Sequence, residues 1–159
     1  MNTTFVIREA HTGDAPEVAT MLGELLAEIT RITGQQAFNF DFTKSLSQFE
    51  DFLDKGRYFV FVARTTADQP AGFIALCESY ALYTEGVFGS IPEFYIRPGF
   101  REQGLGLRLL SQAKAFAAAR GWKRLEVTTP PLPQFDRTLA FYEREGFSIS
   151  GGRKLKMSL

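Results

Sequence analysis

The segment that most constrains the fold runs from Ile96 to Arg120, where an apolar run passes through a glycine-rich turn directly into a helical pattern. The first N–H groups of a helix have no intrahelical acceptor, and the helix dipole adds partial positive charge at the same place. Gly104 and Gly106 carry no Cβ, so a ligand can approach the backbone closely. Arg101 adds a cation that suits phosphate groups. The segment therefore predicts an anion site, which we interpret as a pyrophosphate site.

The composition argues against several classes of function. The 159 residues include 18 basic and 18 acidic side chains, which argues against nucleic-acid binding through bulk charge. The single Cys77 excludes an internal disulfide framework and a multi-cysteine metal site, and the single His11 argues against a histidine metal cluster. No leader pattern or apolar run of membrane length occurs. We therefore expect one cytoplasmic domain over residues 1–159, with no metal and neither nucleic acid nor membrane as a partner.

Apolar periodicity predicts a mixed order of strands and helices. Strands are expected at 5–7, 58–63, 71–83, 87–96 and 125–129, with two more in 147–159, and helices at 14–33, 43–55, 104–120 and 136–146. Asp14, Thr43 and Asp136 are the expected helix caps, and the aromatic alternation at 38–42 fits a strand or a loop equally well. The unbroken apolar run at 58–63 favours a central strand.

The strand expected at 87–96 contains Pro92. Proline cannot donate a hydrogen bond to a neighbouring strand, so it marks an edge or a bulge. The whole pattern predicts an α/β (α+β) fold of one domain, with a mixed, mostly antiparallel sheet of about seven strands and about four flanking helices.

Three local motifs follow one another at a fixed order along the chain. They are Glu93-Phe94-Tyr95-Ile96-x-Pro98 at the end of a strand, Arg101-x-x-Gly104-x-Gly106 between strand and helix, and Ala140-Phe141-Tyr142-Glu143-Arg144-Glu145-Gly146-Phe147 downstream. Each motif alone is weak, but the ordered combination resembles the GCN5-related N-acetyltransferase (GNAT) family. The resemblance covers nearly the whole chain in element order, and its specific sequence content lies mainly in residues 91 to 147.

The resemblance implies a sheet splayed at its central strands, acetyl-CoA as the acyl donor, and a primary amine of a small molecule or peptide as the acceptor. It implies that the pyrophosphate lies on backbone amides of the glycine loop, while the pantetheine arm pairs with the preceding strand. The cofactor-binding residues that follow from it are Phe94, Tyr95, Ile96, Arg101, Glu102, Gln103, Gly104, Leu105, Gly106 and Leu107. One position departs from the family pattern: Phe135 stands where many members carry an asparagine that assists cofactor binding.

Transfer of an acyl group from a thioester to an amine requires a base for the amine and a proton for the leaving thiolate. Glu93, next to Pro92, is our candidate base, and the alternative is an ordinary surface glutamate. The resemblance implies that Tyr142 is the acid that protonates the sulfur. The alternative is that its ring only packs on Phe147 where the helix ends at Gly146. Because no cysteine or serine lies in a nucleophile motif, we expect direct transfer in a ternary complex.

Two other classes of function remain alternatives. A non-catalytic acyl-CoA-binding sensor or regulatory module would need the glycine loop but neither Glu93 nor Tyr142. An interaction domain would use the terminal strands to build a homodimer, and it is compatible with catalysis. The aromatic residues at 38–42 fit the core or an acceptor pocket, and Glu78 or Glu85 near them would favour a cationic acceptor.

Overall fold

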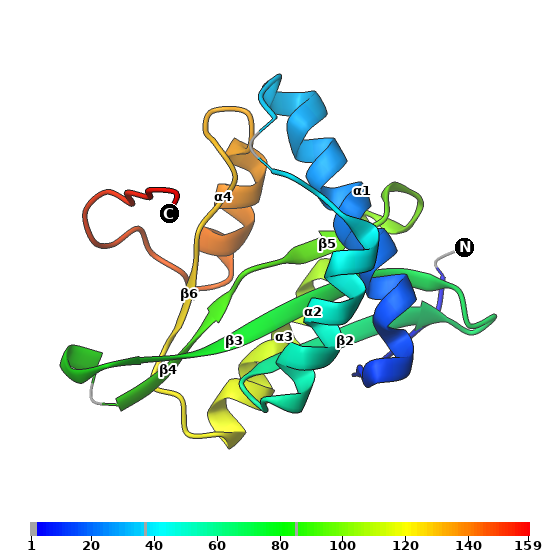
Figure 1. Ribbon diagram of the computed structural model, residues 1–159, viewed down its shortest axis with the longest axis horizontal. Coiled ribbons are helices and arrows are strands. Elements are labelled where there is room, and N and C mark those ends of the chain that lie inside the picture. The colour runs from blue at the N-terminus through cyan, green and yellow to red at the C-terminus, as the bar shows by residue number, and fades with distance from the viewer. Residues whose placement is uncertain (1–2, 37, 85) are drawn as a thin grey trace. The chain divides into compact units, whose positions relative to one another are not determined.

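The computed structural model describes residues 3–36, 38–84 and 86–159, and these group into two compact units, one up to Thr128 and one spanning Thr129–Leu159 (Figure 1). The first unit contains every strand of the described chain, and the second contains the last helix. Within these ranges, no helix combines the length and the apolar character needed to cross a membrane. Whether the chain forms a single domain stays a prediction.

The elements alternate as a mixed α/β fold. The strands are β1 (Phe5–Glu9), β2 (Tyr58–Thr65), β3 (Pro70–Ala81), β4 (Gly86–Ile91), β5 (Phe94–Ile96) and β6 (Leu125–Val127). The helices are α1 (Ala15–Thr33), α2 (Phe42–Asp54), α3 (Leu105–Ala119) and α4 (Asp136–Arg144), with short 3-10 turns η1 (Thr12–Asp14), η2 (Leu82–Thr84) and η3 (Pro98–Phe100). The sheet order is β1-β2-β3-β4-β6, with β5 also paired to β3. Only the β4–β6 pair is parallel, so the expectation of a mixed, mostly antiparallel sheet is confirmed.

Strand β2 is central, as its unbroken apolar run predicts, because helices cover both faces of the sheet. Alternate side chains of a strand point to opposite faces. On one face Val60 and Val62 belong to a core cluster with Met21 of α1 and Phe49 of α2. On the other face the Phe59 ring lies 4.7 Å from the ring of Phe116 in α3, centroid to centroid. Figure 1 shows this layering, with α1 and α2 in front of the sheet and α3 behind it.

The single strand expected at 87–96 is wrong, because the chain breaks there into β4 and β5. On β3, Ile74 lies opposite Phe94 of β5 and Cys77 lies opposite Ser90 of β4. Residues 75 and 76 of β3 therefore lie opposite three residues, 91 to 93, at the junction of β4 and β5. This extra residue makes a β-bulge at Pro92. Beyond it β6 pairs with β4 at 89–91, while β5 pairs only with β3 among the described strands. The sheet is thus splayed at this point, as expected.

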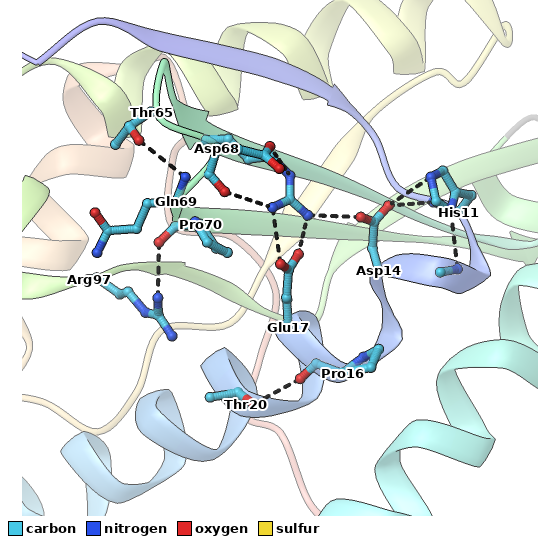
Figure 2. Close-up of polar contacts among 12 residues, drawn as sticks. His11, Asp14, Pro16, Glu17, Thr20, Thr65, Asp68, Gln69, Pro70 and Arg97 are labelled. Atoms are coloured by element: carbon cyan, nitrogen blue, oxygen red, sulfur yellow. Dashed lines mark hydrogen bonds and ion pairs between the residues drawn. The ribbon is translucent and has the colours of Figure 1, made fainter.

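Asp14 occupies the N-cap position of α1, as expected, but its side chain makes no capping hydrogen bond there, because a buried arginine binds it. Arg64 of β2 is 6% exposed, and its Nη2 atom donates to Asp14 Oδ1 at 2.9 Å and also to Glu17 (Figure 2). A buried guanidinium needs such counter-charges, so both carboxylates of the expected capping pair turn toward it. His11, for which the sequence predicted no role, caps η1, where its Nδ1 atom accepts from the Gly13 N–H at 3.1 Å.

The other expected caps are also shifted, while the expected helix ends are correct. Helix α2 is capped by Asp41, whose Oδ1 atom accepts from the Lys44 N–H at 2.9 Å, and not by Thr43. Asp136 is the first residue of α4 and makes no capping hydrogen bond there. Residues 38–41 have no regular secondary structure, and Glu85 lies outside the described residues. The predicted ends of α1 and α3 are confirmed by left-handed glycines, Gly34 at φ 69° and Gly121 at φ 76°.

The two strands expected in residues 147–159 are wrong, and because the expected 87–96 strand is divided into two, the described sheet has six strands rather than seven. The apolar residues of this segment are exposed, Leu155 at 88%, Met157 at 81% and Leu159 at 113%. Alternation of apolar and polar residues stabilises a strand only when a neighbouring strand and a covered face are available. The strands that the homodimer alternative requires are thus not formed within the chain, and the homodimer stays a prediction.

Candidate active site

The turn before α3 leaves the first backbone amides of that helix without an internal partner. Gly104 occupies the N-cap position at φ 77°, and its carbonyl accepts the first helical bond from the Arg108 N–H at 3.1 Å. Gly104 has no side chain and makes no capping hydrogen bond. The N–H groups of Leu105, Gly106 and Leu107 therefore have no acceptor within the helix or its cap. A Cβ at Gly104 would meet no atom within 4 Å. The predicted helix start is confirmed, and the space beside it is open.

Arg101, the cation predicted to meet the phosphates, is held by two protein groups. Its Nε atom donates to the Ile96 carbonyl at 2.8 Å, and its Nη2 atom donates to the two carboxylate oxygens of Glu28 in α1 at 2.9 and 3.1 Å. The guanidinium also lies 5.7 Å from the centroid of the Tyr95 ring. A phosphate would therefore share this cation with Glu28.

The next two residues of the turn have other roles in its geometry. Glu102 has a positive φ of 62°, which reverses the chain toward Gly104. Gln103 accepts a hydrogen bond from the Thr3 N–H at its Oε1 atom, at 2.7 Å, and so ties the N-terminal segment to the turn. Any contact of these two residues with a cofactor stays a prediction.

Strand β5 hydrogen-bonds to β3 along one edge, and the backbone groups on its other edge point away from β3. The Ala75 N–H donates to the Glu93 carbonyl at 2.8 Å, and the Arg97 N–H donates to the Ala71 carbonyl at 2.9 Å. Because hydrogen-bonded pairs alternate along antiparallel strands, the backbone groups of Phe94 and Ile96 point to the opposite edge. That is the edge along which the pantetheine arm is expected.

The Tyr95 side chain belongs to the core rather than to this edge. It is 5% exposed, and its hydroxyl donates to Glu24 of α1 at 3.3 Å. Glu24 in turn binds the Arg97 guanidinium at 3.0 and 2.8 Å. Its backbone N–H and C=O groups point toward β3, so a contact of Tyr95 with the cofactor stays a prediction.

Glu93 lies in the bulge, on the face of the sheet that α1 and α2 cover. It is opposite Ala75 of β3, and Cys77, two residues further along β3, is opposite Tyr58 of β2. The three side chains of Glu93, Cys77 and Tyr58 therefore share one face. The Tyr58 hydroxyl donates a hydrogen bond to Oε2 of the half-buried Glu93. Glu93 is thus partly buried and hydrogen-bonded, and its role as the base stays a prediction.

Burial sets the protonation of this cluster. Desolvation raises the pKa of Glu93 above its ordinary value, and the hydrogen bond from Tyr58 opposes that rise. Burial also raises the pKa of Tyr58, and the nearby Glu93 charge raises it further. The Cys77 thiol has a raised pKa as well, because of burial and the carboxylates of Glu93 and Glu78. The cluster thus contains a carboxylate that binds a proton more readily than an exposed one, and a thiol that loses its proton less readily than an exposed one.

Tyr142 lies in the second unit, at the end of α4. The Phe147 N–H donates to the Tyr142 carbonyl at 3.0 Å, the Gly146 N–H donates to the Glu143 carbonyl at 3.2 Å, and Gly146 has φ 101°. This Schellman motif and the 5.4 Å separation of the Tyr142 and Phe147 rings confirm the predicted helix end. Tyr142 is 5% exposed, and burial raises its pKa, so the phenol keeps its proton at neutral pH. Its catalytic role stays a prediction.

Sequence reasoning missed Tyr58 and Glu28, which are the partners of two predicted site residues. Tyr58 is the first residue of an apolar run, and nothing in that run distinguishes its hydroxyl from a core side chain. Glu28 lies on the polar side of a helix pattern among other acidic residues. Only the strand register and the packing of α1 bring them to Glu93 and Arg101. In the described ranges, no group of three or more histidine, cysteine, aspartate or glutamate residues could hold a metal ion.

Comparison with known proteins identifies a family for this arrangement. The model of the acetyltransferase (GNAT) domain family matches residues 55–149, more than half of the chain. An integron cassette protein from the mobile metagenome of Cole Harbour Salt Marsh is 25% identical, with a TM-score of 0.79 over 96% of this chain and 90% of that one.

Two further solved structures share the fold. A transcriptional regulator from Bacillus halodurans C-125 is 24% identical, with a TM-score of 0.80 over 98% of this chain and all of that one (100%). A predicted acetyltransferase from Clostridium acetobutylicum, solved with acetyl-CoA, is 16% identical, with a TM-score of 0.79 over 98% and 96% of the two chains. No curated protein sequence gave a significant match.

Proposed function

Because the chain belongs to the GNAT acetyltransferase family, we propose that it transfers the acetyl group of acetyl-CoA to a primary amine of a small molecule or peptide. The transfer is direct, within a ternary complex of protein, acetyl-CoA and amine. The raised pKa of the Cys77 thiol supports this route, because a protonated thiol is a poor nucleophile for an acetyl-enzyme.

The observation that carries the proposal is the position of Glu93. The bulge at Pro92 opens the sheet and places a half-buried carboxylate beside the opening. An amine with a pKa near ~10.4 is protonated at neutral pH and cannot attack a thioester until it loses a proton. A carboxylate whose pKa is raised toward neutrality is a better base for that proton than an exposed one.

The start of α3 supports acetyl-CoA as the donor. Its first amides receive no side-chain cap, and the open space beside Gly104 leaves room for a phosphate to approach them. The diphosphate of acetyl-CoA would be held by the N–H groups of Leu105, Gly106 and Leu107, with Arg101 contributing after partial release from Glu28. The pantetheine arm would follow the outer edge of β5.

The chain's residues divide the proton transfers between them. Glu93 accepts a proton from the ammonium group, and the neutral nitrogen then forms the new bond to the acetyl carbon while the carbon–sulfur bond breaks. An N–H group of the bulged strand stabilises charge on the acetyl oxygen. Tyr142 donates a proton to the departing sulfur and regains one from solvent, the second proton lost by the nitrogen goes to water, and Glu93 returns its proton to solvent. The products are an amide and coenzyme A.

Two measurements on the full chain test the proposal. Isothermal titration calorimetry with acetyl-CoA reports donor binding, and detection of the free thiol of coenzyme A over a panel of amines reports turnover. The proposal predicts binding and thiol release with at least one amine, with the acetylated product identified by mass spectrometry. Binding without turnover on any amine would support the acyl-CoA sensor instead, and no binding would contradict both.

A further inference from the structure

The Tyr58 hydroxyl has a contact that the proposed chemistry leaves unexplained. Tyr58 begins β2, and its side chain reaches across β3 to the bulge, where it donates a hydrogen bond to Oε2 of Glu93. The two residues are 35 positions apart in sequence and belong to segments that do not pair with each other. Such a contact fixes one oxygen of a carboxylate in a specific orientation.

The second oxygen of Glu93 is left for another partner. Its Oε1 atom accepts no hydrogen bond from the residues the structure describes, whereas Oε2 accepts the bond from Tyr58. The only buried side-chain nitrogen or oxygen without a hydrogen-bond partner in that part of the chain is Nε of Arg64. Oε1 of Glu93 is therefore accessible rather than buried. One oxygen is anchored, and the other is accessible.

Tyr58 is itself held in place by neighbours that carry no competing charge. The Phe52 ring of α2 lies 5.4 Å from the Tyr58 ring, centroid to centroid, and packs against it. Cys77 lies opposite Tyr58 on β3. The titratable groups that face Glu93 are thus the Tyr58 phenol from β2 and the Cys77 thiol from β3, while α2 contributes an apolar ring.

We propose that Tyr58 is a positioning residue, which anchors Oε2 of Glu93 and directs Oε1 toward the amine of the acceptor. This inference rests on the proposed function, because it requires Glu93 to be the base. The anchor also has an electrostatic effect. A hydrogen bond donated to a carboxylate favours the charged form, so Tyr58 keeps Glu93 ionised in a half-buried site where burial favours the neutral acid.

The variant Tyr58→Phe removes the hydroxyl and keeps the ring that packs on Phe52. Tyr80→Phe is the matched control, because Tyr80 also donates to a glutamate, at 2.8 Å, but its acceptor is Glu78 rather than Glu93. The first readout needs no acceptor: the carboxyl carbons of the full chain, labelled with ¹³C-glutamate, are titrated by NMR, and Glu93→Gln assigns the Glu93 signal. We expect Tyr58→Phe to move the Glu93 midpoint upward by about one pH unit, and Tyr80→Phe to leave it unchanged.

The second readout is the pH dependence of kcat/KM with an amine that the wild-type protein acetylates. In Tyr58→Phe the midpoint of the acidic limb should move to higher pH, together with the NMR midpoint of Glu93. The kcat should fall, while the affinity for acetyl-CoA stays within about twofold of the wild-type value. A merely structural role would lower activity equally at every pH, without a shift of the limb.

The outcomes separate this inference from the proposed function. If Glu93→Gln retains full turnover, Glu93 is not the base and the proposed mechanism fails. If Glu93→Gln is inactive but the Glu93 midpoint is the same in Tyr58→Phe and wild type, the positioning role of Tyr58 is overturned while the base remains. If no amine is turned over, the NMR titration alone decides whether Tyr58 controls the ionisation of Glu93.

Discussion

Glu28 of α1 binds Arg101 through both carboxylate oxygens, at 2.9 and 3.1 Å from Nη2, so the arginine of the turn before α3 is partly neutralised before any ligand arrives. The Arg101 side chain is 39% exposed and that of Glu28 is 17% exposed. Glu24 and Arg97 form a parallel pair one helical turn earlier. Together the two pairs tie α1 to β5 and to the glycine turn.

The first prediction concerns this pair. Glu28→Gln removes the competing carboxylate, so acetyl-CoA should bind more tightly by up to about fivefold, the equivalent of an exposed ion pair of up to about 1 kcal/mol. Titration calorimetry measures the change, and Asp51→Asn, which removes one charge from the surface pair with Lys55, is the control. Weaker binding in Glu28→Gln would mean that Glu28 orients Arg101 for the phosphates rather than competing with them.

The second prediction separates ligand contact from backbone strain at Gly104. Gly104 and Gly121 flank α3 with nearly equal φ angles of 77° and 76°, and a Cβ at either meets no atom within 4 Å. Alanine at either position should therefore lower the free energy of unfolding by a similar amount, about 1 kcal/mol. Gly104→Glu should in addition abolish acetyl-CoA binding, because its carboxylate repels phosphate at the helix start. Calorimetry and thermal melts decide, with Gly121→Glu as the matched control; binding retained by Gly104→Glu would refute the phosphate placement.

The third prediction concerns Tyr142. Tyr142→Phe should lower kcat by about 10²-fold or more while acetyl-CoA affinity stays nearly unchanged, because only the proton for the sulfur is lost. Since burial raises the pKa of this phenol, its ionisation should produce no alkaline decline of kcat between pH 7 and about 9. Steady-state kinetics with a verified acceptor provide the measurement, and Tyr83→Phe, which alters an exposed phenol, is the control. Unchanged turnover would remove Tyr142 from the mechanism.

The fourth prediction follows from the raised pKa of Glu93. A carboxyl whose pKa is higher in the folded than in the unfolded chain binds protons more strongly when folded, so it destabilises the protein above the unfolded pKa of about 4.3. The cost grows as pH rises from that value through the folded pKa. Glu93→Gln should therefore match the wild type in unfolding free energy near pH 4 and exceed it at pH 7. Urea denaturation across this range, with the exposed Glu50→Gln as control, tests the sign; a variant less stable than wild type at pH 7 would contradict it.

The sequence predicted the central layers of the fold and the start of α3 because those signals are local. An unbroken apolar run requires cover on both faces, and β2 has it. Pro92 cannot donate to a ladder, so the expected bulge lies there, although it divides one expected strand into two. Gly104 and Gly121 bound α3 because both positions require a left-handed backbone.

The features that the sequence did not predict depend on partners far along the chain. Asp14 and Glu17 read as a capping pair, but the buried Arg64, almost fifty residues later, binds both of them. Residues 154–159 have the alternation of a strand but no neighbour to pair with. At the candidate site, Glu93 could be selected from its place after Pro92, whereas its contact with Tyr58 follows from strand register, which no single residue reveals.

The most direct test of the central claim compares wild type and Glu93→Gln for release of coenzyme A thiol at pH 7, with saturating acetyl-CoA and an amine accepted by the wild type. We expect both proteins to bind acetyl-CoA with similar affinity and Glu93→Gln to turn over about 10²- to 10⁴-fold more slowly. Equal rates in the two proteins would contradict the assignment of the carboxylate at the bulge as the base of an acetyl transfer.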